Sequence, residues 1–160
     1  MSHPVELWLF DLSNGMAKQL SMAFVGKEIE GIWHTSVIAY GKEHFYGAEG
    51  ISHESPGSSM VGFNTYKRFP MGETDIPPDV FYDYLKQLGN GQFAGENYKL
   101  FEHNCNNFSN EVCTFLVGKP IPDFITNLPN EVLQTPFGQM IKPMIEQAQL
   151  HVTSQNQGQN

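Results

Sequence analysis

Residues 98–112 read YKLFEHNCNNFSNEV, in which one cysteine, Cys105, lies among small polar side chains. The asparagines around it are typical helix caps, and apolar residues follow at positions i, i+4, i+7 and i+8 of one helical face. These apolar residues are Phe108, Val112, Phe115 and Leu116. A glycine and a proline, which are typical of a helix end, come within three residues after Val117. The stretch therefore predicts a helix from Asn104 or Asn106 to Val117, with the cysteine in its first turn.

The position of Cys105 at a helix start favours a reactive thiol. The first turn of a helix presents unpaired backbone N–H groups and the positive end of the helix dipole, which can lower a thiol pKa from about 8.5 toward 7 or below. The same N–H groups can hold the oxyanion that forms during acyl transfer. A buried structural thiol is the alternative, because free cysteine also packs as a small hydrophobe. The second cysteine, Cys113, lies among apolar residues and is expected to be core packing.

A thiol nucleophile also needs a base, and histidine is the usual one. Of the six histidines, His34 lies in residues 32–40, a segment rich in β-branched and aromatic residues that predicts a strand. It stands beside Trp33, and the alternative role for it is that of a core histidine with its hydrogen bonds satisfied. His44 is expected on an exposed hairpin, and His103 is expected to point away from the cysteine two residues later. The others fall at the N-terminus, in a Gly/Ser-rich loop and in the C-terminal tail, namely His3, His53 and His151.

Alternating and periodic apolar residues predict the remaining elements. Strands are expected at residues 5–12, at 42–46, around Ile51 and at 65–69, where Pro70 ends the last one. Helices are expected at residues 16–25, 79–88 and 129–150, the last of them bent or broken before Pro143. Residues 1–150 are therefore expected to form one domain, and residues 151–160, which are rich in Gln and Asn, a disordered polar tail.

Composition excludes several classes of protein. A chain of 160 residues suits one domain, and its net charge of -8 repels nucleic acid phosphates and anionic membrane surfaces. Two cysteines are too few for a secreted disulfide framework, and the first residues lack the features of a signal peptide, which predicts a reducing, intracellular compartment. No apolar run approaches the roughly 18 to 20 residues that span a bilayer.

The two thiols are not expected to bond to each other or to share a metal. If both lie on one helix, eight residues separate their Cα atoms by about 12 Å, which is too far for a disulfide. A zinc site would have to draw on His34, His103, Cys105 and Cys113, but the sequence has no C-x-x-C pair. We therefore expect no metal and no cofactor.

Two segments resemble the signature blocks of the PPPDE family, the permuted papain-fold peptidases. They are residues 31–36, which read GIWHTS, and residues 98–112, quoted above. Three further segments, VELWLFDLSNGMA, FYGAEGI and ITNLPNEVLQTPFGQMIKP, look like the DeSI-type desumoylating isopeptidases within that family. The resemblance extends from about Val5 to Met144, nearly the whole predicted domain.

This resemblance implies an α+β domain with a permuted papain-like fold, in which a small antiparallel β-sheet or barrel packs against helices. It implies that Cys105 is the nucleophile and His34 the general acid/base of a catalytic dyad. Asn104 and Asn106 are candidates for orienting the dyad or holding the oxyanion, and Trp33 for one wall of a narrow groove that admits a glycine tail. The implied reaction removes SUMO from lysines of target proteins through a thioester intermediate.

Other functions stay open at this point. The same dyad would also suit a deubiquitinating isopeptidase or a thioesterase acting on S-acylated proteins, and a non-catalytic adaptor module is a third possibility. The resemblance further implies SUMO-conjugated proteins as partners, a homodimer with the groove near the subunit interface, and localisation in the cytoplasm and nucleus.

Overall fold

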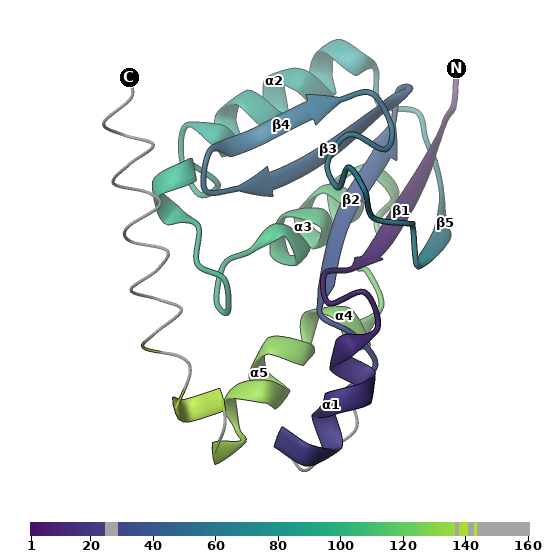
Figure 1. Cartoon of the computed structure of the whole chain (residues 1–160). Coiled ribbons are helices and arrows are strands. Elements are labelled where there is room, and N and C mark those ends of the chain that lie inside the picture. Colours follow the sequence, from purple (N-terminus) through teal and green to yellow (C-terminus); the bar gives the residue numbers. More distant parts are fainter. Residues whose placement is uncertain (25–28, 137, 141–142, 144–160) are drawn as a thin grey trace.

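The structure, a computed structural model of the whole chain, describes residues 1–24, 29–136, 138–140 and 143. Five antiparallel strands form one sheet in the order β4-β3-β2-β1-β5 (Figure 1). The strands are β1 (His3–Asp11), β2 (Trp33–Ala39), β3 (Lys42–Gly47), β4 (Gly50–Glu54) and β5 (Lys67–Thr74). The helices are α1 (Met16–Phe24), α2 (Pro78–Gly89), the 3-10 turn η1 (Gly95–Asn97), α3 (Cys105–Val117), α4 (Asp123–Thr126) and α5 (Leu128–Leu133). The α+β class is confirmed, and the described sheet is open rather than closed into a barrel.

The predicted strands are all present, but β5 is longer than expected. The sequence predicts that Pro70 ends this strand, whereas β5 continues to Thr74. β5 is an edge strand, and edge positions tolerate proline because one side of the strand needs no backbone partner. A shift of register opposite Val5 and Glu6 leaves Met71 without a cross-strand partner. This β-bulge lets the strand continue past the proline.

The residues that predict α3 also cap it. The Asn104 side chain accepts hydrogen bonds from the backbone N–H groups of Asn106 and Asn107, and the Asn107 side chain bonds back to the N–H of Asn104. At the other end, Gly118 has a φ of 71° and its N–H donates to the carbonyl of Thr114. Only glycine adopts this left-handed conformation at no steric cost, so the helix stops where the sequence predicts.

The C-terminal region differs from its prediction. The sequence predicts one helix over residues 129–150, but α5 ends at Leu133, and the short α4 before it is not predicted. The Thr135 hydroxyl donates to the carbonyl of Val132 and accepts from the N–H of Gly138, and these local bonds compete with the helical pattern. The expected break before Pro143 and the expected tail at residues 151–160 lie outside the described residues.

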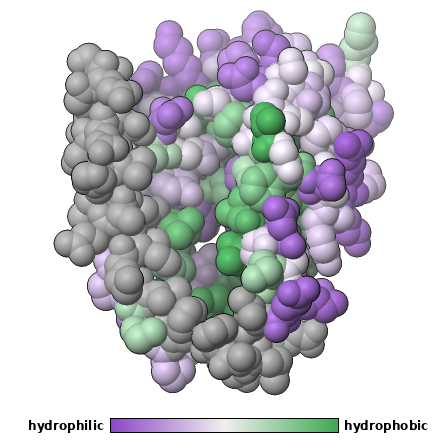
Figure 2. All heavy atoms as spheres, in the orientation of Figure 1, coloured by the Kyte–Doolittle hydropathy of each residue, from purple (hydrophilic) through white to green (hydrophobic). Residues whose placement is uncertain are grey.

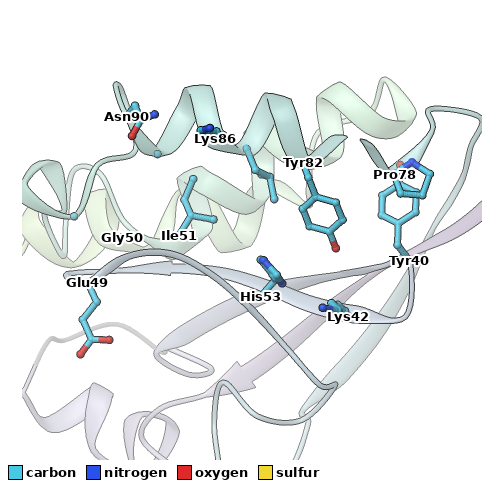
Figure 3. A pocket seen from close by; sticks show the side chains of 13 residues that line it. Tyr40, Lys42, Glu49, Gly50, Ile51, His53, Pro78, Tyr82, Lys86 and Asn90 are labelled. Carbon is cyan, nitrogen blue, oxygen red and sulfur yellow. The ribbon is translucent and has the colours of Figure 1, made fainter. Parts of the chain in front are cut away.

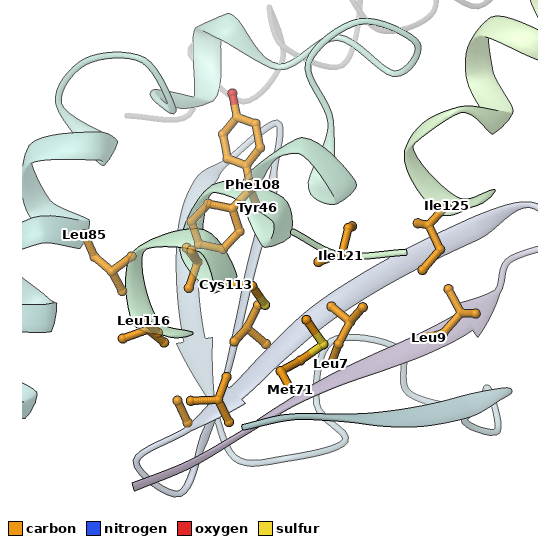
Figure 4. Packing of buried hydrophobic residues seen from close by; sticks show 14 of the residues in the cluster. Leu7, Leu9, Tyr46, Met71, Leu85, Phe108, Cys113, Leu116, Ile121 and Ile125 are labelled. Carbon is orange, nitrogen blue, oxygen red and sulfur yellow. The ribbon is translucent and has the colours of Figure 1, made fainter. Parts of the chain in front are cut away.

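The hydrophobic core lies between the sheet and helices α2 and α3 (Figure 4). It is built from the inward residues of the strands and the apolar faces of the helices, including Leu7, Leu9, Val37, Tyr46, Phe81, Phe108, Val112 and Leu116. Cys113 is fully buried among them, as predicted. Burying each such side chain contributes about 1.5–3 kcal/mol, so α3 is fixed rigidly against the sheet.

A separate groove lies between α2 and the β3–β4 hairpin, with a volume of about 810 Å³ (Figure 3). Its lining includes Tyr40, Lys42, His53, Tyr82 and Lys86. Neither of the two candidate catalytic residues is among its lining residues. Within the described ranges, no helix has the length and hydropathy to cross a membrane.

Candidate active site

The first turn of α3 lies against the edge of β2. β3 pairs with residues 37–39 of β2, so the earlier residues of β2 have no partner on this side among the described strands. Here the Asn106 Nδ2 donates to the carbonyl oxygen of Trp33 at 3.1 Å. The Thr35 hydroxyl donates to Asn106 Oδ1 and lies equally close, 2.8 Å, to the hydroxyl of Ser109. These bonds join residues more than 70 positions apart and hold the helix start against the strand.

Cys105 is the first residue of α3 and lies at this junction. Its side chain is buried, and the backbone N–H groups of Thr35 and Asn106 are directed toward its sulfur. The S–H group lies 3.7 Å from Asn106 Oδ1, which can accept its proton. Donors from both β2 and α3 therefore surround the sulfur, and such donors stabilise a thiolate once it forms.

Burial nevertheless keeps the resting thiol protonated. Desolvation raises the pKa of Cys105 to about 11, and the nearby backbone N–H groups offset only part of this rise. The predicted lowering of this pKa is therefore wrong for the free site, because the loss of water around the buried thiol outweighs the effect of the helix start. Burial also raises the pKa of Cys113 to about 12, and both cysteines are free.

His34 directly precedes Thr35 on β2, so the backbone of this strand links the two predicted catalytic residues. Its ring lies 5.8 Å from that of Phe10, its cross-strand partner on β1. The side chain is half-buried, but the Nε2 atom is inaccessible to water and has no hydrogen-bond partner. Desolvation lowers the pKa of His34 to about 4, and the charge of Glu43 opposes this shift. At neutral pH the ring is therefore a neutral base with an unused nitrogen.

The two asparagines that flank Cys105 have different environments. The Asn104 side chain caps α3, and its Nδ2 donates to the carbonyl of Leu100 at 2.6 Å. Both ends of its side-chain amide therefore form hydrogen bonds at or next to the helix start. The Asn106 side chain instead forms hydrogen bonds with Trp33 and Thr35 and accepts one from the thiol of Cys105. It therefore connects the cysteine to the strand that carries His34.

Trp33 is buried and connects the junction to an apolar surface. Its ring lies 5.1 Å from Tyr66 and 5.9 Å from Phe124, and both of these rings are exposed. Ile32, the residue before it, is exposed as well. Hydrophobic side chains gather around a hollow on the face of the molecule shown in Figure 2.

The other described histidines already have partners or lie on the surface. The sequence places His44 on an exposed hairpin, but it is fully buried, because α2 covers this face of β3. Its Nδ1 donates to the carbonyl of Val37 at 3.0 Å, and its Nε2 accepts from the hydroxyl of Tyr82 at 2.9 Å. His103 bonds to the carbonyl of Gln92 and stacks on Phe93, as expected of a ring that points away from the cysteine. His151 lies outside the described residues.

The family follows from comparison with known proteins. Residues 3–146 match the family model described as "PPPDE putative peptidase domain". The chain belongs to the PPPDE peptidase family. It is 47% identical over 154 residues to Desumoylating isopeptidase 1 of Xenopus laevis. The aligned region covers 96% of this chain and 90% of the relative. Desumoylating isopeptidase 1 of Homo sapiens is also 47% identical, over 92% of this chain and 88% of the relative. The Desumoylating isopeptidase 1 homolog of Caenorhabditis elegans is 32% identical, over 67% of this chain and 34% of the relative.

Three buried polar residues of this PPPDE chain are not predicted from its sequence. Thr35 and Ser109 are both fully buried at the junction, and Glu43 is fully buried on β3. A signal was present for the first two, because a threonine next to His34 and a serine one turn after Cys105 interrupt faces that are otherwise apolar. Glu43 carried no such signal, because a charged residue in a short hairpin is normally exposed.

The described part of this PPPDE chain contains no group of three His, Cys, Asp or Glu side chains that could hold a metal ion. Two of the four side chains considered for zinc have other surroundings. His103 bonds to the backbone and Cys113 lies in the core, two turns away from the junction.

Proposed function

We propose that this protein is a cysteine isopeptidase that removes SUMO from lysines of target proteins, with Cys105 as nucleophile and His34 as general acid/base. The main observation is the junction between β2 and α3, in which the backbone N–H of Thr35 reaches the sulfur of Cys105 directly after His34. The relatives of this chain bear the name desumoylating isopeptidase, which supports SUMO conjugates as substrates. A peptidase dyad on a rigid sheet and helix fits this reaction.

In the resting state the thiol of Cys105 and the imidazole of His34 are both neutral, since the pKa of Cys105 is about 11 and that of His34 about 4. In the proposed reaction, the thiol proton passes to His34 as the sulfur bonds to the carbonyl carbon of the isopeptide bond. His34 then gives this proton to the lysine amine as the carbon–nitrogen bond breaks, which leaves SUMO as a thioester on Cys105. Water, activated by the neutral imidazole, hydrolyses the thioester and restores the thiol.

The side chains around the dyad take supporting roles in this proposal. Asn106 orients the thiol, because it bonds to the cysteine and to β2 at once. Asn104 holds the first turn of α3 so that the N–H of Cys105 can donate to the oxyanion. Trp33 and the exposed rings of Tyr66 and Phe124 form one wall of a narrow groove for the glycine tail. Asn106→Ala with an unchanged kcat would remove that residue from the mechanism.

The decisive experiment incubates a SUMO-conjugated protein with the wild type and with two cysteine variants. We expect Cys105→Ala to lose cleavage, whereas Cys113→Ala, the matched control on the same helix, keeps it. Equal cleavage by Cys105→Ala and the wild type would reject the proposal. Probes that carry SUMO, ubiquitin or a fatty acyl thioester then rank the substrates, and the proposal requires the SUMO probe to react fastest.

The alternative of a non-catalytic adaptor is tested with the same proteins. An electrophilic probe that labels the wild type but not Cys105→Ala shows that the thiol is reactive. If neither protein is labelled between pH 7 and pH 9, the adaptor explanation replaces the enzymatic one. Labelling is expected to increase with pH across this range, because the pKa of Cys105 is about 11.

We also propose that the protein is a homodimer that uses the apolar surface around Trp33. Ile32, Tyr66 and Phe124 are exposed there, next to the β2–α3 junction, and apolar surface of this kind is typical of interfaces. Light scattering should find a dimer for the wild type and a monomer for Phe124→Asp. Val80→Asp on α2, whose side chain is about equally exposed, is the control that stays dimeric. A monomeric wild type would contradict the proposal.

A location in both cytoplasm and nucleus is part of the proposal, because SUMO conjugates are its expected substrates. Cell fractionation or imaging of the tagged full chain would test it. Detection in only one of the two compartments would contradict it.

A further inference from the structure

Glu43 is an acidic residue with no access to solvent, and its carboxylate is held from several sides. The hydroxyl of Ser36 on β2 donates to Oε2 at 2.6 Å. The backbone N–H groups of Gly57 and Ser59 donate to Oε1 at 2.8 Å and 3.3 Å, and the Ser59 hydroxyl donates to Oε2. Glu43 accepts every one of these bonds, which is the role of an ionised carboxylate.

These bonds attach the Gly/Ser-rich segment after β4 to the sheet. Gly57 and Ser59 lie after the end of β4 and are joined to β3 through Glu43 rather than through a strand ladder. Burying a charged carboxylate is costly unless hydrogen bonds compensate, and these supply the compensation. The arrangement keeps one negative charge inside the protein at a fixed position.

That position is on the same face of the sheet as His34. Glu43 pairs with Ile38 across the β2–β3 ladder, and side chains two residues apart on a strand share a face. His34, Ser36 and Ile38 therefore lie in one row of β2, with Ser36 bonded to the Glu43 carboxylate. The Nε2 of His34 is buried and has no hydrogen-bond partner. The negative charge of Glu43 raises the pKa of His34, against the effect of burial.

Other charged side chains of this face have different surroundings. Glu6 of β1 accepts a hydrogen bond from the Trp8 indole N–H, and the Arg68 guanidinium of β5 stacks on the Trp8 ring at 4.0 Å. Glu54 of β4 pairs directly with Glu43 across the ladder, but it is exposed. Exposed charges are screened by water and salt, whereas a buried one acts at closer to full strength.

We infer that Glu43 is a positioning residue, whose buried negative charge stabilises His34 in the protonated form that arises when Cys105 transfers its proton. This inference rests on the dyad of the proposed function. Glu43 exchanges no atom or proton in the reaction; it remains a carboxylate while the imidazole passes from neutral to charged and back. Its charge makes His34 a stronger base than burial alone would allow.

Glu43→Gln tests this inference, because it keeps the size of the side chain and removes the charge. Glu54→Gln removes the same charge from the exposed partner position, and Ser59→Ala weakens the loop contact while keeping the buried charge. We expect Glu43→Gln to slow alkylation of Cys105 by iodoacetamide at pH 7 by about 10-fold. The acidic limb of its kcat/KM profile should also move to lower pH.

The two control variants separate charge from structure. Glu54→Gln should stay within about 2-fold of the wild type, and Ser59→Ala should keep the acidic limb of the wild type. If Ser59→Ala moves that limb as Glu43→Gln does, or if Glu43→Gln leaves it in place, the inference is overturned. A wild type that fails to cleave SUMO conjugates would reject the proposed function instead. The alkylation rates need no substrate and would still decide the role of Glu43.

Discussion

His34 and His44 lie on neighbouring strands and face opposite sides of one sheet. Burial lowers the pKa of both rings to about 4, so both are neutral at physiological pH. They differ in their hydrogen bonds. Both nitrogens of His44 are bonded, to Val37 and Tyr82, whereas the buried Nε2 of His34 has no partner.

This difference separates a structural histidine from one available for chemistry. The pKa alone does not distinguish the two rings, because desolvation is the first cause of the shift in each. A ring with both nitrogens bonded cannot accept a proton from a nucleophile without breaking a bond of the fold. A buried nitrogen without a partner is costly, and such groups cluster where a site requires them. The variants below exchange or remove these features one at a time.

The largest effect is expected for His34→Ala. Removing the general base should reduce kcat/KM on a SUMO-conjugated substrate by about 1,000-fold, within the range typical of this kind of catalysis. The melting temperature should change by only a few degrees, because the ring is half-buried and its Nε2 contributes no hydrogen bond. His44→Ala is the matched control and should retain activity below its melting temperature. If both variants lose activity equally while folded, the two histidines are not distinguished by their bonds.

The second prediction concerns stability, where the order of the two histidines is reversed. His44→Ala removes a fully buried ring and two hydrogen bonds and leaves the Tyr82 hydroxyl and the Val37 carbonyl unpaired. The free energy of unfolding should fall by about 2–4 kcal/mol, as measured by urea denaturation. His34→Ala should cost less than half of that. A larger loss for His34→Ala would show that its ring has a structural role.

Much of the fold could be predicted from sequence because its signals are local. The period of β1, the capping asparagines of α3 and the glycine at its end depend on neighbouring residues, and the structure confirms each. The failures at β5 and α5 come from non-local or competing bonds. Pro70 is accommodated by an edge position and a bulge, and Thr135 forms bonds that interrupt the helix.

The candidate site divides in the same way. The placement of Cys105 at a helix start follows from its neighbours, whereas its raised pKa depends on the packing of β2 against α3. The burial of His44 beneath α2 and that of Glu43 beneath the loop after β4 depend on contacts between distant segments. A single sequence contains no local signal for such contacts. The sequence of the hairpin therefore predicts an exposed position for both residues, whereas both are buried.

The third prediction is a loss of stability in acid that both histidines share. The unfolded rings bind a proton near pH 6.5, but the folded rings bind one only near pH 4. Between these values the unfolded chain binds more protons, so the free energy of unfolding falls as the pH decreases from 6.5 toward 4. His44→Phe should reduce this slope by up to about 1.4 kcal/mol per pH unit, the value for one proton. Urea denaturation at several pH values measures the slope, and an unchanged slope would show that the folded His44 ring titrates normally.

The smallest effect is expected for Tyr82→Phe, which leaves the Nε2 of His44 without a hydrogen bond, as that of His34 already is. Tyr82→Phe removes the hydroxyl that donates to the His44 Nε2 and leaves that buried nitrogen without its partner. The loss should be about 1 kcal/mol, the usual net value of one hydrogen bond, and should lower the melting temperature by a few degrees. Tyr66→Phe, which alters an exposed tyrosine, should cost less than about 0.5 kcal/mol. Because the new free nitrogen lies on the opposite face from His34, Tyr82→Phe should not alter the alkylation rate of Cys105. A change in that rate would show that the two faces of the sheet are coupled.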